Sequence, residues 1–105
     1  MPKYLYQASY TADGAKGLLK EGGSKRRAMV EEMTKAAGGK IEAFYFAFGD
    51  SDVYLIVDTP DHATAAAISL AVNASGAVTL KTTVLLTPEE VDQAAKKTVK
   101  YRSPG

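Results

Sequence analysis

The sequence of 105 residues predicts one α+β domain of the ferredoxin-like type, in which helices cover one face of a four-stranded antiparallel sheet. Strand and helix patterns follow one another in the order β-α-β-β-α-β, and a short polar turn joins the two middle strands directly. The length and the 46% hydrophobic fraction are those of a single globular domain. A further helix follows the last strand, so we assign residues 1–99 to the domain and residues 100–105 to a tail.

The first strand is predicted over Lys3–Tyr10, where aromatic and small residues alternate with mostly polar ones. One side of this strand carries Tyr4, Tyr6, Ala8 and Tyr10. The next segment, residues 11–23, contains four glycines, and we expect a loop with one short helical turn over residues 15–20. This segment lacks the Gly-Lys-Ser/Thr pattern of a phosphate-binding loop, so it is a plain loop or a mobile flap.

A helix is predicted from a cap at Ser24 to about Ala37, because apolar residues recur there at spacings of three and four. Its expected buried stripe consists of Val30, Met33 and Ala37. Gly38 and Gly39 end it, since glycine readily adopts the positive φ of a helix terminus.

The second and third strands are predicted over Lys40–Phe48 and Val53–Asp58, and they form a hairpin. The turn between them consists of Gly49, Asp50, Ser51 and Asp52. On the second strand we expect Phe44, Phe46 and Phe48 to share one face, and Ile41, Ala43, Tyr45 and Ala47 to share the other.

The alanine-rich segment after Pro60 predicts a helix capped by Thr59 or Asp61, running to about Ala74 before Gly76. The fourth strand is predicted over Val78–Leu86, which is rich in β-branched residues. Thr87, followed by proline and two acidic residues, predicts the start of a last helix that runs to about Val99.

The apolar residues of the sheet predict self-association. Residues 41–48 carry apolar side chains on both faces and residues 53–57 are almost entirely apolar, whereas the helices can cover only one face. An open apolar patch of this kind is uncommon on a monomer, so we expect a second copy to pack sheet to sheet about a two-fold axis. The alternative is that the terminal helix folds over the sheet.

Composition excludes several classes of site. The chain has no cysteine and one histidine, which excludes disulfides, thiolate metal sites, iron–sulfur clusters and multi-histidine metal sites. We therefore expect no metal and no cofactor. A net charge of +1 does not favour nucleic acid as a partner. No signal or membrane segment is visible, so we expect a soluble cytoplasmic protein without a membrane partner.

The hairpin carries a family resemblance. The segment from Phe44 to Val53, followed by residues 56–61, resembles the GYD domain family, which is named for a Gly-Tyr-Asp turn between the second and third strands. The resemblance extends to the opening Pro2-Lys3-Tyr4 strand, the glycine helix ends and the start of the last helix. Ser51 stands where the tyrosine of the naming turn would be.

The resemblance implies a fold and an assembly. The family is similar in plan to the dimeric α/β-barrel superfamily, whose members include cofactor-free oxygenases, haem-processing enzymes and small ligand-binding regulators. The family itself is functionally uncharacterised, so the resemblance implies no catalytic residues, and fold by itself does not define function.

The polar candidates each have two readings. Asp50 and Asp52 could share a proton or hold a cation, or they could simply stabilise a tight turn. His62 forms a polar stripe with Ser69 and Asn73, which either faces solvent or lines a pocket. Lys25, Arg26 and Arg27 could hold an anion with Ser24 at a helix N-terminus, or form a solvated face.

The strand tyrosines are candidates for contacts with a small aromatic or apolar ligand. We name Tyr4, Tyr6, Tyr45 and Tyr54, together with Asn73, as candidate ligand-binding residues; packing in the core or between copies is their alternative role.

Three functions remain open. The first is a homo-oligomeric module that binds a ligand or supports assembly, with a pocket between sheet and helices. The second is a cofactor-independent oxygenase or isomerase of a small aromatic or enolisable substrate, with His62 or Asp52 as its base. The third is a purely structural oligomer.

Overall fold

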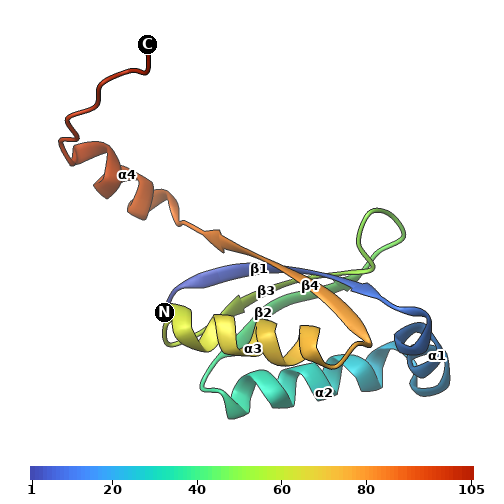
Figure 1. The fold of residues 1–105 in the computed structure, drawn as a ribbon. Coiled ribbons are helices and arrows are strands. Elements are labelled where there is room, and N and C mark those ends of the chain that lie inside the picture. Colours follow the sequence, from blue (N-terminus) through green and yellow to red (C-terminus); the bar gives the residue numbers. More distant parts are fainter.

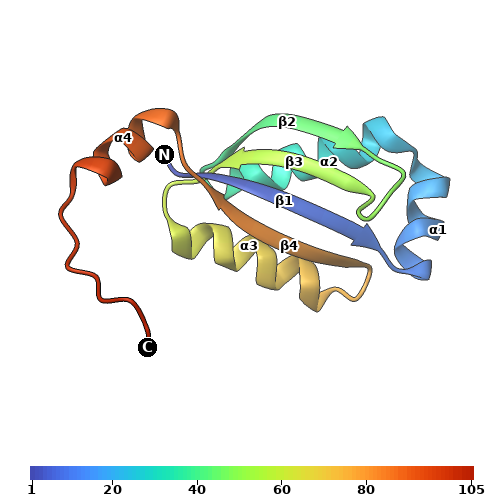
Figure 2. The ribbon, with the colours of Figure 1, turned by 90° about the horizontal axis from the view of Figure 1, so that it is seen from above.

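The computed structural model describes residues 1–105 and contains one sheet and four helices (Figure 1). The elements are β1 (Lys3–Tyr10), α1 (Ala12–Glu21), α2 (Gly23–Ala36), β2 (Lys40–Phe46), β3 (Val53–Asp58), α3 (His62–Ala74), β4 (Val78–Leu85) and α4 (Pro88–Lys96). The sheet is antiparallel with the strand order β2-β3-β1-β4, and α2 and α3 lie on one of its faces (Figure 2). The predicted ferredoxin-like α+β fold is confirmed.

The core lies between the sheet and its two covering helices. Tyr4 and Tyr6 of β1 are each 2% exposed, and they face the helices together with Leu55 and Val57 of the neighbouring strand β3. Alternation along a strand then directs every second residue to the opposite face. The tyrosines of β1 therefore belong to the covered face.

Helix α1 corrects the expected loop over residues 11–23. The hydroxyl of Thr11 accepts a hydrogen bond from the amide of Gly14, which caps the helix and compensates for its glycines. Gly14 has a packing role, because a Cβ there would lie 2.0 Å from the carbonyl oxygen of Ala77. The backbone of α1 thus approaches the connection between α3 and β4 more closely than alanine would allow.

Helix α2 begins two residues earlier than expected, and the predicted cap at Ser24 is wrong. Its N-cap is Gly22, with φ of 86°, which supplies no side-chain hydrogen bond. A single glycine therefore joins α1 to α2 by a sharp turn. The buried residue of α2 is Thr34, which lies outside the predicted stripe and donates from its hydroxyl to the carbonyl of Val30.

Strand β2 is shorter than predicted and contains a bulge. The register shifts between Ile41 and Ala43, so that Ile41 pairs with Val57 and Phe44 pairs with Leu55. Ile41 and Phe44 therefore pack on the same side, against the core, which corrects the expected separation of these two residues. Phe48 lies beyond the strand in the loop, where its side chain is fully exposed.

The second half of the chain follows the sequence expectations closely. Asp61 caps α3 by accepting hydrogen bonds from the amide and the hydroxyl of Thr64. These bonds stabilise the charged carboxylate, and the bond from the hydroxyl of Thr64 contributes more than the bond from its amide. The pKa of Asp61 therefore lies below its ordinary value. Thr87 and Glu90 form a reciprocal capping box at α4, which ends at Lys96 rather than Val99.

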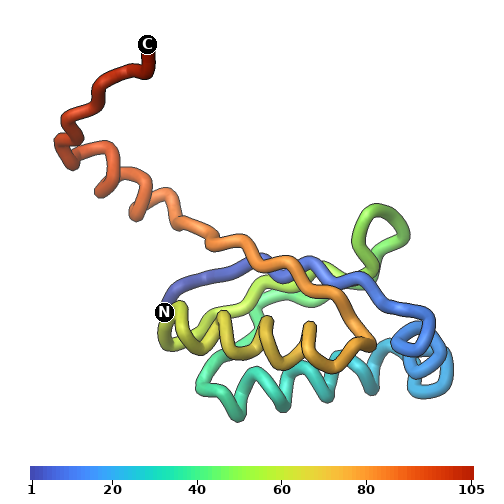
Figure 3. Tube along the Cα trace, in the orientation of Figure 1, coloured from blue at the N-terminus to red at the C-terminus, as the bar shows by residue number.

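Helix α4 does not cover the open face of the sheet. It follows β4 away from the domain, and the last residues extend farther still (Figures 1 and 3). None of its residues is buried, and it makes no extensive contact with any other element. The alternative in which the terminal helix folds over the sheet is therefore wrong for this structure.

The single chain exposes more surface than a compact protein of its size. Its accessible surface is 7502 Å², whereas a compact monomer of this mass exposes about 5,700 Å². The open sheet face and the projecting C-terminal segment both contribute to the difference. No helix has the length and apolar character needed to cross a bilayer.

Candidate functional site

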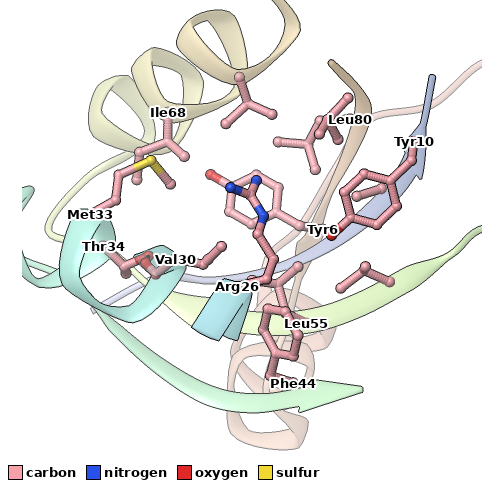
Figure 4. A pocket seen from close by; sticks show the side chains of 14 residues that line it. Tyr6, Tyr10, Arg26, Val30, Met33, Thr34, Phe44, Leu55, Ile68 and Leu80 are labelled. Atoms are coloured by element: carbon pink, nitrogen blue, oxygen red, sulfur yellow. Dashed lines mark hydrogen bonds between the residues drawn. The ribbon is translucent and has the colours of Figure 1, made fainter. Parts of the chain in front are cut away.

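An apolar cavity lies between the sheet and the helices α2 and α3 (Figure 4). All four strands and both helices contribute to its walls, and twelve of its fourteen lining residues are hydrophobic. They include Tyr6, Leu55, Val30, Ile68, Val72 and Val78. Its free volume is about 40 Å³, which is room for about three water-sized groups. The gap forms because α2 packs mainly on β2, whereas α3 packs mainly on β4.

A wider groove adjoins the cavity at the end where α1 lies. The groove has a volume of about 440 Å³ and runs along α1, α2 and the last turn of α3. Five residues line both spaces: Tyr10, Arg26, Met33, Val72 and Val78. These shared residues form the boundary through which the inner cavity meets the groove.

The buried hydroxyl in the cavity wall is already engaged. Tyr6 donates a hydrogen bond of 2.8 Å to the carbonyl of Ala65 in α3, which joins the sheet to the helix. Burial, with a smaller contribution from the neighbouring Tyr4, raises the pKa of Tyr6 to about 12. Tyr6 therefore keeps its proton at neutral pH and acts there as a donor.

Two other polar groups of the cavity have no partner. Arg26 is half-buried, and it forms neither an ion pair nor a side-chain hydrogen bond, since the three ion pairs of the chain join other residues. The hydroxyl of Tyr10 likewise has no hydrogen-bond partner. Figure 4 shows the guanidinium of Arg26 and the hydroxyl of Tyr10 directed toward the interior of the cavity.

His62 lies away from this cavity. It is the first residue of α3, exposed on the surface, and its Nδ1 forms a hydrogen bond with the hydroxyl of Tyr4. The two rings also meet edge to face, with centroids 5.7 Å apart. Neither residue lines the cavity, so the contact joins the start of α3 to the start of β1.

Asp52 holds the hairpin against the other end of β1. Its carboxylate accepts a hydrogen bond from the backbone amide of Tyr10, and its own amide donates to the carbonyl of Ala8, both at 2.8 Å. Tyr4 and Tyr10 are about 20 Å apart along the strand at ~3.3 Å per residue. The structure therefore does not bring His62 and Asp52 together.

The rest of the hairpin turn lies between solvent and the sheet. Gly49 and Asp50 are exposed, whereas Ser51, at the position of the family's tyrosine, is 5% exposed. Asp50 forms no ion pair with a basic side chain. No group of three or more histidine, cysteine, aspartate or glutamate side chains gathers anywhere in the chain to hold a metal ion.

The remaining candidates divide between the open sheet face and the sheet edge. Tyr45 and Tyr54 are paired across β2 and β3 on the open face, opposite to the cavity. Asn73 exchanges hydrogen bonds with the backbone of Leu80, which fixes the last turn of α3 to β4, and its amide is 3.4 Å from the hydroxyl of Ser69. Of the five candidate ligand-binding residues, only Tyr6 lines the cavity.

Sequence reasoning did not single out Arg26 or the free hydroxyl of Tyr10 as members of one site. It placed Arg26 within a basic cluster and Tyr10 within a strand face. The available signal was that Arg26 lies four residues before Val30, so it extends the apolar stripe of the helix by one turn with a basic residue. Nothing in the sequence shows that α1 would line a groove next to this cavity.

The comparisons with known proteins identify the family. Residues 4–95, nearly the whole chain, match the GYD domain. Searches of curated proteins and of solved structures gave no significant match. The match covers the sheet, its helices and the hairpin described above, and the chain therefore belongs to the GYD domain family.

Proposed function

We propose that the protein is a homo-oligomeric module that binds a small, largely apolar ligand between its sheet and its helices. The observation that carries this proposal is the cavity enclosed by α2, α3 and all four strands. Apolar walls with a few polar groups at one end are typical of small-molecule sites. The adjoining groove gives the cavity access to solvent.

The open face of the sheet supports self-association. One row across it contains Ala43, Ile56, Leu5 and Thr83, and the next contains Tyr45, Tyr54, Gln7 and Lys81. No helix of the chain covers these rows. A second copy that brings the same face to this one by a two-fold rotation would bury them. The excess surface of the single chain, about 1,800 Å², is large enough to include one side of a standard interface of about 800 Å².

The charges at one end of this face are neutralised within the chain. Lys3, at one end of β1, pairs with Asp58 at 2.9 Å and with Glu42 at 3.0 Å, so its charge is neutralised within its own chain. Both carboxylates stabilise the charged ammonium, Asp58 more than Glu42, and the pKa of Lys3 is raised. Lys81 is then the basic side chain left in the two central rows.

Cofactor-independent catalysis is a second candidate function, and one observation favours it. The hydroxyl of buried Tyr4 meets His62, which is a pairing that can relay a proton. Under this reading His62 acts as the base, with Asp52 at the far end of β1 as the other candidate. Neither His62 nor Asp52 lines the cavity, which weakens this reading relative to ligand binding.

Native mass spectrometry of the untagged protein tests both parts of the main proposal. We expect a dimer, or a larger assembly of dimers, that carries extra mass from a bound small molecule. A bare oligomer would contradict ligand binding and favour the purely structural role. A clean monomer at micromolar concentration would contradict self-association.

A matched pair of variants assigns any extra mass to the cavity. Val30→Phe places a larger side chain at the cavity wall, and Ala28→Phe adds a phenyl ring to an exposed position of the same helix. We expect the extra mass to be lost only in Val30→Phe. Retention of the mass in both variants would show that the ligand binds elsewhere.

A further inference from the structure

We infer that the ligand of this cavity is a short apolar monocarboxylate whose carboxylate is held by Arg26 and Tyr10 at the junction of the cavity and the groove. This inference rests on the proposed ligand-binding function and adds the chemical class of the ligand. It assigns roles to two residues that face one site from different elements, α2 and β1.

Arg26 is the one basic residue of the chain that is half-buried and forms no ion pair. Its side chain lies among the apolar residues of the cavity wall, and no carboxylate lies within ion-pair distance of its guanidinium. Its neighbour Arg27 differs, since it pairs with Glu31 one turn further along α2 at 3.3 Å and is well exposed. A bound carboxylate would supply the missing partner, because guanidinium and carboxylate match in shape and charge.

The position of Arg26 along α2 also favours a bound anion. It lies in the first turn of the helix, where the positive end of the helix dipole disfavours a cation. The same positive end favours an anion, and long side chains on a helix lean toward its N-terminus. The helix dipole and the guanidinium of Arg26 would therefore both stabilise a bound carboxylate.

Tyr10 supplies a second donor to the same place. Its backbone amide is engaged by Asp52, but its hydroxyl is free and directed into the cavity (Figure 4). It lines both the inner cavity and the groove, as Arg26 does. A carboxylate has two oxygens, so one can accept from Arg26 while the other accepts from Tyr10.

The size and charge of the two spaces limit the rest of the ligand. The inner cavity, at about 40 Å³, admits a short apolar tail of a few carbon atoms. Beyond the junction, the groove carries the carboxylates of Asp13 and Glu21. A second negative charge that extended outward would meet these two groups. The site therefore suits a monocarboxylate better than a dicarboxylate.

Three probes of similar length test the inference: pentanoate, pentan-1-ol and glutarate. Each is titrated into ¹⁵N-labelled full-length protein, and the dissociation constant is taken from the shifts of the backbone amides of Thr34 and Leu55 in the cavity wall. We expect pentanoate to bind about 10- to 100-fold more tightly than pentan-1-ol, which is the range of a charge-assisted hydrogen bond. Glutarate should bind more weakly than pentanoate.

Variants assign the preference to the two donors. Arg26→Gln should remove the advantage of pentanoate over pentan-1-ol, and Arg27→Gln, which removes the same charge one residue away, should preserve it. Tyr10→Phe should reduce the advantage while retaining the ring that packs against the core. The amide spectrum of each variant shows directly whether the fold is retained.

The outcomes separate this inference from the proposed function. If pentanoate and pentan-1-ol bind the cavity equally well, the inference is overturned and the ligand-binding function stands. If none of the three probes shifts the cavity amides up to the millimolar range, the inference is overturned, and native mass spectrometry then decides the ligand-binding function. An equal loss in Arg26→Gln and Arg27→Gln would overturn the inference by showing that general positive charge attracts the acid.

Discussion

The two faces of the sheet are built from the same strands but differ in what covers them. Leu55 and Ile56 are neighbours on β3, yet Leu55 is 6% exposed beneath the helices and Ile56 is only half-buried on the open face. Tyr6 of the covered face is 2% exposed, whereas Tyr45 of the open face is 71% exposed. The comparison shows that apolar side chains alone do not make a core, because a second layer must exclude water from them.

The largest effect is expected from truncation on the covered face. Leu55→Ala removes most of a buried side chain and leaves a cavity, so the free energy of unfolding should fall by about 2–5 kcal/mol. Urea unfolding of the variant and the wild type measures this difference. A loss below about 1 kcal/mol would show that the helices do not seal the covered face as tightly as the comparison requires.

A charge placed on the open face should change the oligomeric state of the protein. Ile56→Lys places two like charges near each other across the proposed two-fold interface, where such a juxtaposition costs several kcal/mol. We expect sedimentation velocity to show a monomer with the far-ultraviolet circular dichroism of the wild type. Ala66→Lys, at an exposed position of α3 on the other side of the sheet, serves as a control for added charge. An unchanged oligomer in Ile56→Lys would contradict sheet-to-sheet packing.

A smaller effect is expected at the hydrogen bond that joins the covered face to α3. Tyr6→Phe removes the donor to the carbonyl of Ala65 and should lower the free energy of unfolding by about 1 kcal/mol. Tyr101→Phe, in the exposed tail, should have no measurable effect.

The same tyrosine predicts an alkaline pH dependence. Because the pKa of Tyr6 is raised from 10.0 to about 12 in the folded chain, the unfolded chain loses this proton first as the pH rises. The contribution of Tyr6 to stability is therefore complete below about pH 10 and is lost between about pH 10 and pH 12. Urea unfolding across this interval should show a shallower decline for Tyr6→Phe than for the wild type. Parallel curves would contradict a raised pKa.

The smallest effect is expected from the C-terminal segment. Deletion of residues 88–105 removes α4, which contacts neither face extensively, so the free energy of unfolding should change by less than about 0.5 kcal/mol. The helical circular dichroism signal should decrease while the urea midpoint stays unchanged. A clear fall in the midpoint would show that the segment stabilises one of the two faces.

Local signals explain which elements were predicted well. Strands β1 and β3 have the predicted bounds because alternation and bordering turn residues define them. Asp61 and Thr87 begin their helices as expected, since a side-chain acceptor near the free amides stabilises a helix start wherever the rest of the chain lies. The predicted single domain, the cytoplasmic location and the roles of the candidate site residues stay predictions.

The missed features depend on contacts between distant segments. The bulge in β2 changes the face of Ile41, and the helix α1 forms over glycines that a local pattern assigns to a loop. Gly14 illustrates the reason. Its lack of a side chain allows the backbone of α1 to approach Ala77, which lies sixty-three positions further along the chain. Propensity describes a residue and its neighbours, whereas such contacts involve the whole fold.

The sequence by itself determined the order of strands and helices, the antiparallel plan, the family and the absence of thiolate chemistry. Periodicity, caps and composition act over a few residues and are visible in one dimension. Only the tertiary structure decided that the tyrosines of β1 face the helices, that Ile56 and its row stay uncovered, and that Arg26 and Tyr10 reach one cavity. These features depend on how layers pack, and packing brings together residues that the sequence holds far apart.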